Sequence, residues 1–110
     1  MAKRGMQEAT FLILTALAGG AQHGYGVTAD IEESSQGRVR LQAGTLYAAL
    51  DRLRDDGLIE LDREEIVDSR LRRYYRLTTG GEAILAQEAQ RLSAHVRTAL
   101  SRLHLRGGMA

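Results

Sequence analysis

Arginine side chains gather in one short stretch of the chain. The stretch carries Arg70, Arg72, Arg73 and Arg76, with no acidic residue among them. Guanidinium groups in a flexible hairpin tip can hold the phosphates of a DNA duplex or enter its minor groove. The formal net charge is only +1, so this local field, rather than the total charge, favours a nucleic-acid partner. The alternative for the same residues is an ordinary solvated basic loop.

A second candidate region, from Gln36 to Leu50, contains no acidic residue. Within it, Gln42 is of a type that bonds adenine at two points, and Thr45 offers both a hydroxyl and a methyl group. The hydroxyl of Tyr47 is a further donor. The alternative is that these polar residues are incidental surface beside an apolar core. The DNA contacts predicted from the two regions are Gln42, Ala43, Gly44, Thr45, Tyr47, Arg70, Arg72 and Arg73.

Hydrophobic periodicity predicts the elements that must position both regions. Apolar residues at helical spacing, closed by glycines, indicate helices, and alternation with a period of two indicates strands. A polar turn at Val67–Arg70 joins two strands into a hairpin, across which Arg73 is expected to pair with Asp62 or Glu64. The residues from His23 to Gly26 are predicted as a glycine-rich turn, with Tyr25 packed against the third helix. The predicted helices span residues 8–18, 27–34, 43–56 and 79 to about 104, and the predicted strands span 58–63 and 75–78.

Three helices followed by a hairpin and a further helix form the order of a winged helix-turn-helix protein. The predicted fold class is therefore mainly α (α+β), with a two-stranded hairpin as the wing and a long C-terminal helix for dimerisation. In such a fold the third helix presents its N-terminal turn to the major groove, where base edges can be distinguished. Residues 1–78 would form the DNA-binding domain, and residues 79–110 the dimerisation helix and tail.

The last predicted helix carries a narrow apolar stripe. Thr79 and Glu82, at its start, have the spacing of a capping box. The apolar residues then step alternately by four and three, as in a coiled coil. About 25 residues at 1.5 Å each span about 40 Å, which is more than a small core can cover. A homodimer is therefore predicted, and packing on the first helix is the alternative. The stripe consists of Leu85, Ala89, Leu92, Val96, Ala99 and Leu103.

Other chemistries find little support in the sequence. There is no cysteine, and the three histidines are scattered without the spacing of metal ligands. No serine has a plausible general base beside it, and no glycine-rich loop follows a strand, so neither an enzyme nor a cofactor is expected. No signal peptide is visible and no apolar run could span a bilayer, so the protein is expected in the cytoplasm. An effector would bind at the dimer interface.

Several segments together resemble the PadR family of transcriptional regulators. They are His23-Gly24-Tyr25-Gly26, Gly44–Leu53, Gly57-Leu58-Ile59 and Arg72–Thr78, within residues 11–85. The resemblance implies the short form of the family, a dimeric repressor of double-stranded DNA with a single C-terminal helix. It departs at Ala43, where the family commonly has proline, but alanine forms helices well. The alternative function is a winged-helix module that binds another protein and no DNA.

Overall fold

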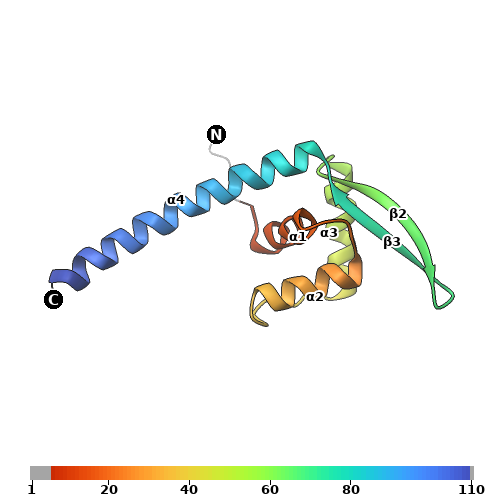
Figure 1. Ribbon diagram of the computed structural model, residues 1–110, viewed down its shortest axis with the longest axis horizontal. Coiled ribbons are helices and arrows are strands. Elements are labelled where there is room, and N and C mark those ends of the chain that lie inside the picture. Colours follow the sequence, from red (N-terminus) through yellow and green to blue (C-terminus); the bar gives the residue numbers. More distant parts are fainter. Residues whose placement is uncertain (1–5, 110) are drawn as a thin grey trace.

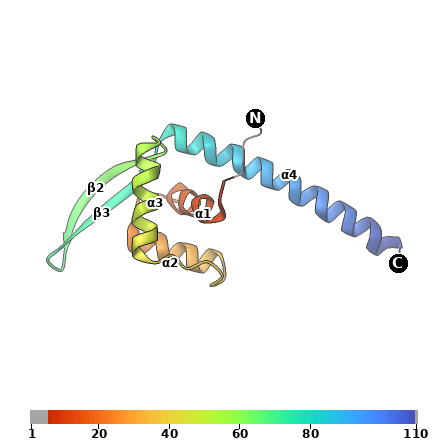
Figure 2. The ribbon, with the colours of Figure 1, turned by 180° about the vertical axis from the view of Figure 1, so that it is seen from behind.

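The structure, a computed structural model, describes residues 6–109, with side chains as far as Leu105. In these residues four helices and three strands follow one another, and Figure 1 labels all of them except the two-residue β1. They are α1 (Glu8–Ala18), β1 (Gln22–His23), α2 (Gly24–Ser34), α3 (Ala43–Asp55), β2 (Ile59–Val67), β3 (Arg70–Leu77) and α4 (Thr79–Met109). The β2–β3 hairpin projects from one side of the packed α1–α3 helices, and α4 extends away on the other (Figure 2). The predicted winged helix-turn-helix order is confirmed.

One apolar core joins the first three helices to the base of the sheet. Ile13 in α1, Ile31 in α2 and Leu50 in α3 have no exposed surface. Ile59 and Tyr75, each 2% exposed, close the core from the sheet side. Burying one large aliphatic side chain contributes roughly 1.5–3 kcal/mol, so these contacts fix where α3 lies relative to the hairpin.

The start of α2 differs from the prediction. The helix begins at Gly24, not at Val27, so the residues predicted as a glycine-rich turn form its first turn. Close packing explains both glycines. A Cβ added at Gly24 would lie 2.6 Å from the hydroxyl oxygen of Tyr47, and one added at Gly26 would overlap the side chain of Gln22.

The hairpin is longer than predicted and belongs to a three-stranded antiparallel sheet of order β1-β3-β2. β1 pairs His23 with Tyr74 and leaves the rest of the β3 edge, toward the tip, without a strand partner in the described chain. The two turn residues, Asp68 and Ser69, have φ values of 51° and 63°, as a tight two-residue hairpin turn requires. A register shift between Leu61 and Arg63 leaves one residue of β2 unpaired, and such a bulge bends its strand.

The joint between the sheet and α4 is tight. Thr78 caps the helix, in place of the predicted cap at Thr79. Its hydroxyl accepts the N–H of Gly81 at 3.0 Å and donates to the carbonyl of Gly57 at 2.6 Å. A Cβ added at Gly81 would overlap the carbonyl oxygen of Leu58. This contact sets the direction in which α4 leaves the core. Because α4 extends away from the core, the molecule is 63 Å long and 32 and 22 Å across.

Candidate nucleic-acid interface

The N-terminal turn of α3 is exposed, whereas the inner face of the helix is buried. Leu46 and Leu50 fill the core and are 2% and 0% exposed. A Cβ added at Gly44 would meet nothing within 4 Å, so packing within the chain does not require glycine there. The helix thus holds an acid-free turn rigidly in front of solvent. The exposed residues of this turn and its cap are Gln42, Ala43, Gly44 and Thr45.

Tyr47 is half-exposed and ties α3 to the beginning of α2. Its ring comes so close to the backbone of Gly24 that an added Cβ would lie 2.9 Å from the ring carbon Cζ. Cβ atoms in proteins essentially never show such a separation. Glycine at position 24 therefore determines where the Tyr47 ring can lie.

The arginines near the base of the hairpin are neutralised by carboxylates. Arg76 donates to Glu60 at 2.8 Å and to Asp62 at 3.2 Å, and the bond to Glu60 raises the pKa of Arg76 above its ordinary value. Arg73 lies 3.5 Å from Glu64, one of the two partners predicted for it. Exposed ion pairs of this kind add little to stability. Here they reduce the positive charge on the lower hairpin.

The arginines nearest the hairpin tip are not compensated in this way. Within the side chains of residues 6–105, no ion pair involves Arg70 or Arg72. Glu65 lies opposite Arg72 in the sheet register, but its carboxylate accepts a 2.8 Å hydrogen bond from Arg63. That bond holds the pKa of Glu65 below its ordinary value. Two guanidinium groups without an ion pair in the described chain therefore follow the turn at the start of β3.

A cavity of about 450 Å³ lies between the wing, the first turn of α2 and Tyr47 of α3. It brings together four residues predicted to contact DNA, which are Tyr47, Arg70, Arg72 and Arg73. Gly44 and Thr45 lie outside it and line a separate hollow of about 400 Å³ between α1 and α3. The structure therefore brings the wing arginines together with Tyr47 and places Gly44 and Thr45 at a different hollow.

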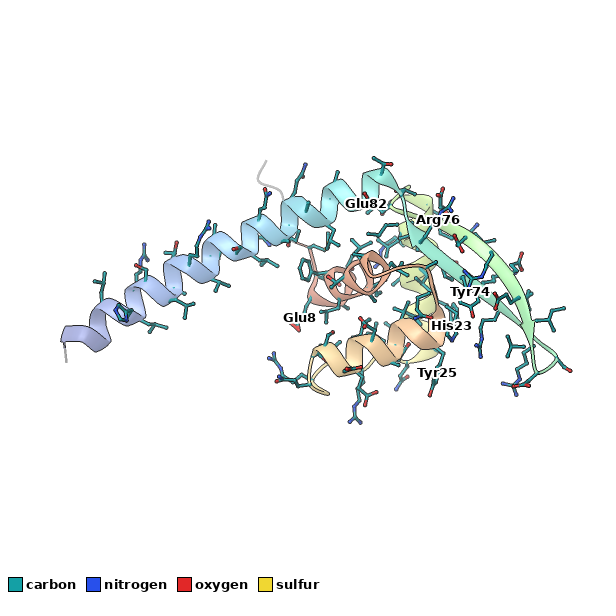
Figure 3. The ribbon with its side chains drawn as sticks, viewed as in Figure 1. Glu8, His23, Tyr25, Tyr74, Arg76 and Glu82 are labelled. Carbon is teal, nitrogen blue, oxygen red and sulfur yellow. The ribbon has the colours of Figure 1, made fainter. Side chains whose placement is uncertain are left out.

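His23 lies beside this cavity, between α2 and the hairpin (Figure 3). Its Nδ1 is 2.6 Å from Oε1 of Gln22, and its ring centroid is 5.2 Å from that of Tyr74. Burial and then the positive charge of Arg72 lower the pKa of His23, against the opposite effect of Glu65. The imidazole is therefore mostly uncharged at neutral pH.

The prediction that Tyr25 packs against the third helix is wrong. Tyr25 is 78% exposed and projects from the first turn of α2 (Figure 3), where it lines the cavity opposite the wing. The prediction placed it in a turn. Tyr25 lies instead in the first turn of α2, between β1 and the buried Val27, and its side chain points outward.

Comparison with known proteins identifies the family. The family described as "Transcriptional regulator PadR-like family" matches residues 13–87. The chain belongs to the PadR family. It is therefore a transcriptional regulator and not an enzyme. Among curated relatives, the transcriptional regulator Rv3488 of Mycobacterium tuberculosis is 38% identical over 88 residues, which cover 80% of this chain and 78% of that protein.

Solved PadR structures have the same fold. A PadR family regulator from Clostridium difficile superposes with a TM-score of 0.73 at 23% identity, over 88% of this chain and 99% of its own. Bacillus subtilis PadR, solved in complex with operator DNA, gives a TM-score of 0.65 at 26% identity. That match covers 74% of this chain and 46% of the Bacillus protein.

The apolar stripe of α4 divides into two parts in this PadR protein. Leu85 is half-buried and packs against the core, and Leu92 is also partly covered. Farther along, Val96 is 54% exposed and Leu103 is 60% exposed. Leu100, which the predicted stripe omitted, is 61% exposed and lies four residues after Val96, on the same side of the helix. Ala89 and Ala99 are exposed as well.

Two further observations concern other kinds of site. In the part of the chain that the structure describes, no three histidine, cysteine or acidic side chains come together as metal ligands would. No described helix combines the length and apolar character that crossing a membrane would require.

Proposed function

We propose that this chain is a sequence-specific repressor that binds a palindromic operator in double-stranded DNA as a homodimer. One observation carries the proposal: Tyr47, from the acid-free segment of α3, and the uncompensated wing arginines Arg70 and Arg72 line the same cavity. The operator complex of Bacillus subtilis PadR supports DNA as the partner. We place this activity in the cytoplasm and assign it no cofactor.

The predicted contacts would have two roles. Side chains at the start of α3 would enter the major groove and read base edges, with Gln42, Thr45 and Tyr47 as the polar contacts and the small Ala43 and Gly44 allowing close approach. The wing would hold phosphates or the minor groove. Arg70 and Arg72 would contribute most there, and Arg73 less, because Glu64 offsets part of its charge.

Dimerisation is proposed to depend on α4. Residues 1–78 would bind DNA, and residues 79–110 would pair the subunits through Ala89, Leu92, Val96, Ala99 and Leu103, and through the part of Leu85 that the chain's own core leaves exposed. A second copy would cover the apolar residues that the far part of α4 exposes. Two linked domains would then read half-sites about one helical turn apart. An effector, if the protein responds to one, would enter at the same interface.

The experiment is a selection of binding sites from genomic DNA, followed by titration of the selected duplex and a random duplex at several salt concentrations. We expect tighter binding to the selected site, and affinity for both duplexes that falls steeply with salt. A reporter behind the selected site should be transcribed less when the protein is present. Higher transcription would contradict repression, and an absence of DNA binding would favour the protein-interaction module.

A further inference from the structure

The cavity between the wing and α2 is a positively charged hollow. Its lining includes the arginines of the hairpin tip, Arg70 and Arg72, and one carboxylate, Asp68 in the turn. A third lining arginine, Arg73, is already paired with Glu64 outside the cavity. The lining thus carries an excess of positive charge, which favours an anion.

Two tyrosines line the same cavity as these arginines. Tyr25 and Tyr47 both line it, the first from α2 and the second from α3. Tyr25 is the most exposed tyrosine beside this surface, at 78%, and no hydrogen bond in the described chain uses its hydroxyl. An aromatic side chain left in solvent with its donor unused is available to a partner that approaches this face.

We propose that the cavity is a binding site for a backbone phosphate of bound DNA, which is held between Arg72 on the wing and the hydroxyl of Tyr25 on α2. Arg70 adds charge at the mouth of the cavity. Phosphate oxygens accept hydrogen bonds from both guanidinium and tyrosine groups, and such contacts set the position of a protein on the duplex without reading sequence. The inference rests on the proposed function, and it adds α2 and Tyr25 to an interface otherwise formed by α3 and the wing.

Arg72 and Tyr25, the two sides of this phosphate-binding site, should respond differently to mutation. Removing a guanidinium that neutralises a phosphate flattens the dependence of log affinity on log salt by about 0.9 for each contact. The Tyr25 hydroxyl is neutral, so its loss should weaken binding without changing that slope. One hydrogen bond corresponds to roughly a threefold to tenfold loss of affinity for each subunit.

The test is fluorescence anisotropy of a labelled random duplex with four proteins: wild type, Tyr25→Phe, Arg72→Gln and Arg76→Gln. Random sequence suffices because phosphate contacts are independent of sequence. Arg76→Gln is the matched control, because it removes the same charge from the same strand at a position bound to Glu60 and away from the cavity. Circular dichroism of each variant verifies that the fold is retained.

We expect Tyr25→Phe to weaken binding at an unchanged slope, and Arg72→Gln to flatten the slope by about two for a dimer, with the slope of Arg76→Gln equal to that of the wild type. Two results would show that the proposed phosphate-binding site is wrong while the proposed function stands. The first is that the wild type and Tyr25→Phe bind DNA equally well. The second is that Arg72→Gln and Arg76→Gln have the same slope. If the wild type does not bind DNA at all, both proposals are wrong.

Discussion

The near part of α4, which contains Leu85 and Glu88, and the far part, which contains Val96 and Leu103, carry the same kind of apolar pattern but have different surroundings. In the near part, Leu85 packs on the core, and Glu88 is only 8% exposed, with its carboxylate accepting the N–H of Met6 at 3.0 Å. In the far part, Val96 and Leu103 are more than half exposed. One periodicity can therefore mark both residues that the chain's own core covers and residues that it leaves exposed. The difference is that the core of the described chain covers the near part of the helix and leaves the far part uncovered.

A charge placed in the far part of α4 should have the largest effect. Replacing Val96 with glutamate would bury an unpaired carboxylate from each subunit in the proposed dimer interface, which costs several kcal/mol. We expect a monomer that keeps its winged core but binds the operator weakly, because the second half-site no longer adds affinity. Sedimentation velocity and an operator titration measure both effects. Thr98→Glu, at an exposed position two residues after Val96 and on the opposite side of the helix, is the control.

A substitution in the near part should instead affect the core. The Cβ of Gly81→Ala would overlap the backbone carbonyl oxygen of Leu58, which cannot rotate away, so we expect a loss of roughly 1–3 kcal/mol in the free energy of unfolding. Gly80→Ala is the matched control, since its Cβ would have only ordinary contacts at 3.7 Å. Alanine there should be neutral or stabilise the helix by up to about 1 kcal/mol. Equal melting temperatures for the two variants would contradict the tight joint.

The sequence predicted the overall fold well because its apolar periods are long. α1 has the predicted bounds, and α3 ends one residue early, before Gly57, whose φ of 76° provides the expected left-handed position. The start of α2 was missed because glycines at positions 24 and 26 resemble a turn locally. Their role is close packing, of Gly24 against the distant Tyr47 and of Gly26 against Gln22 in β1. The two-residue β1 is too short to have a period.

The candidate site was predicted by residue type but not by charge state. Four arginines in one stretch were visible, yet which of them remain uncompensated depends on the hairpin register. The bulge between Leu61 and Arg63 places Glu64 opposite Arg73 and Glu65 opposite Arg72. Whether Glu65 then bonds Arg63 or Arg72 is decided by side-chain geometry. No local pattern in the sequence contains that information.

Substitutions in the exposed turn of α3 should alter specificity and leave the oligomeric state unchanged. Thr45→Ala and Tyr47→Phe each remove one polar contact, worth roughly 1–3 kcal/mol for each half-site if it reads a base. We expect a loss of affinity for the operator that is larger than the loss for random duplex. Equal losses on the two duplexes would show that these side chains only position the protein.

The smallest expected effect concerns pH and the near part of α4. Hydrogen bonds from Arg91, followed by the bond from Met6, lower the pKa of Glu88. A carboxylate with a lowered pKa in the folded state stabilises the protein above its unfolded pKa, and this contribution is lost as the pH falls through the folded value. We expect Glu88→Gln to melt lower at pH 7 and to lose less stability on acidification than wild type. Glu33→Gln, exposed on α2, should behave like wild type in thermal melts followed by circular dichroism.

The central claim is that the far part of α4 is one half of an interface whose other half is a second copy of this chain. Its most direct test is the mass of the wild-type protein in solution, measured by light scattering coupled to size exclusion over a range of concentrations. We expect a particle of twice the 12.1 kDa chain mass that dissociates on dilution or with Val96→Glu. A particle of one chain mass at every concentration, with full operator affinity, would contradict it.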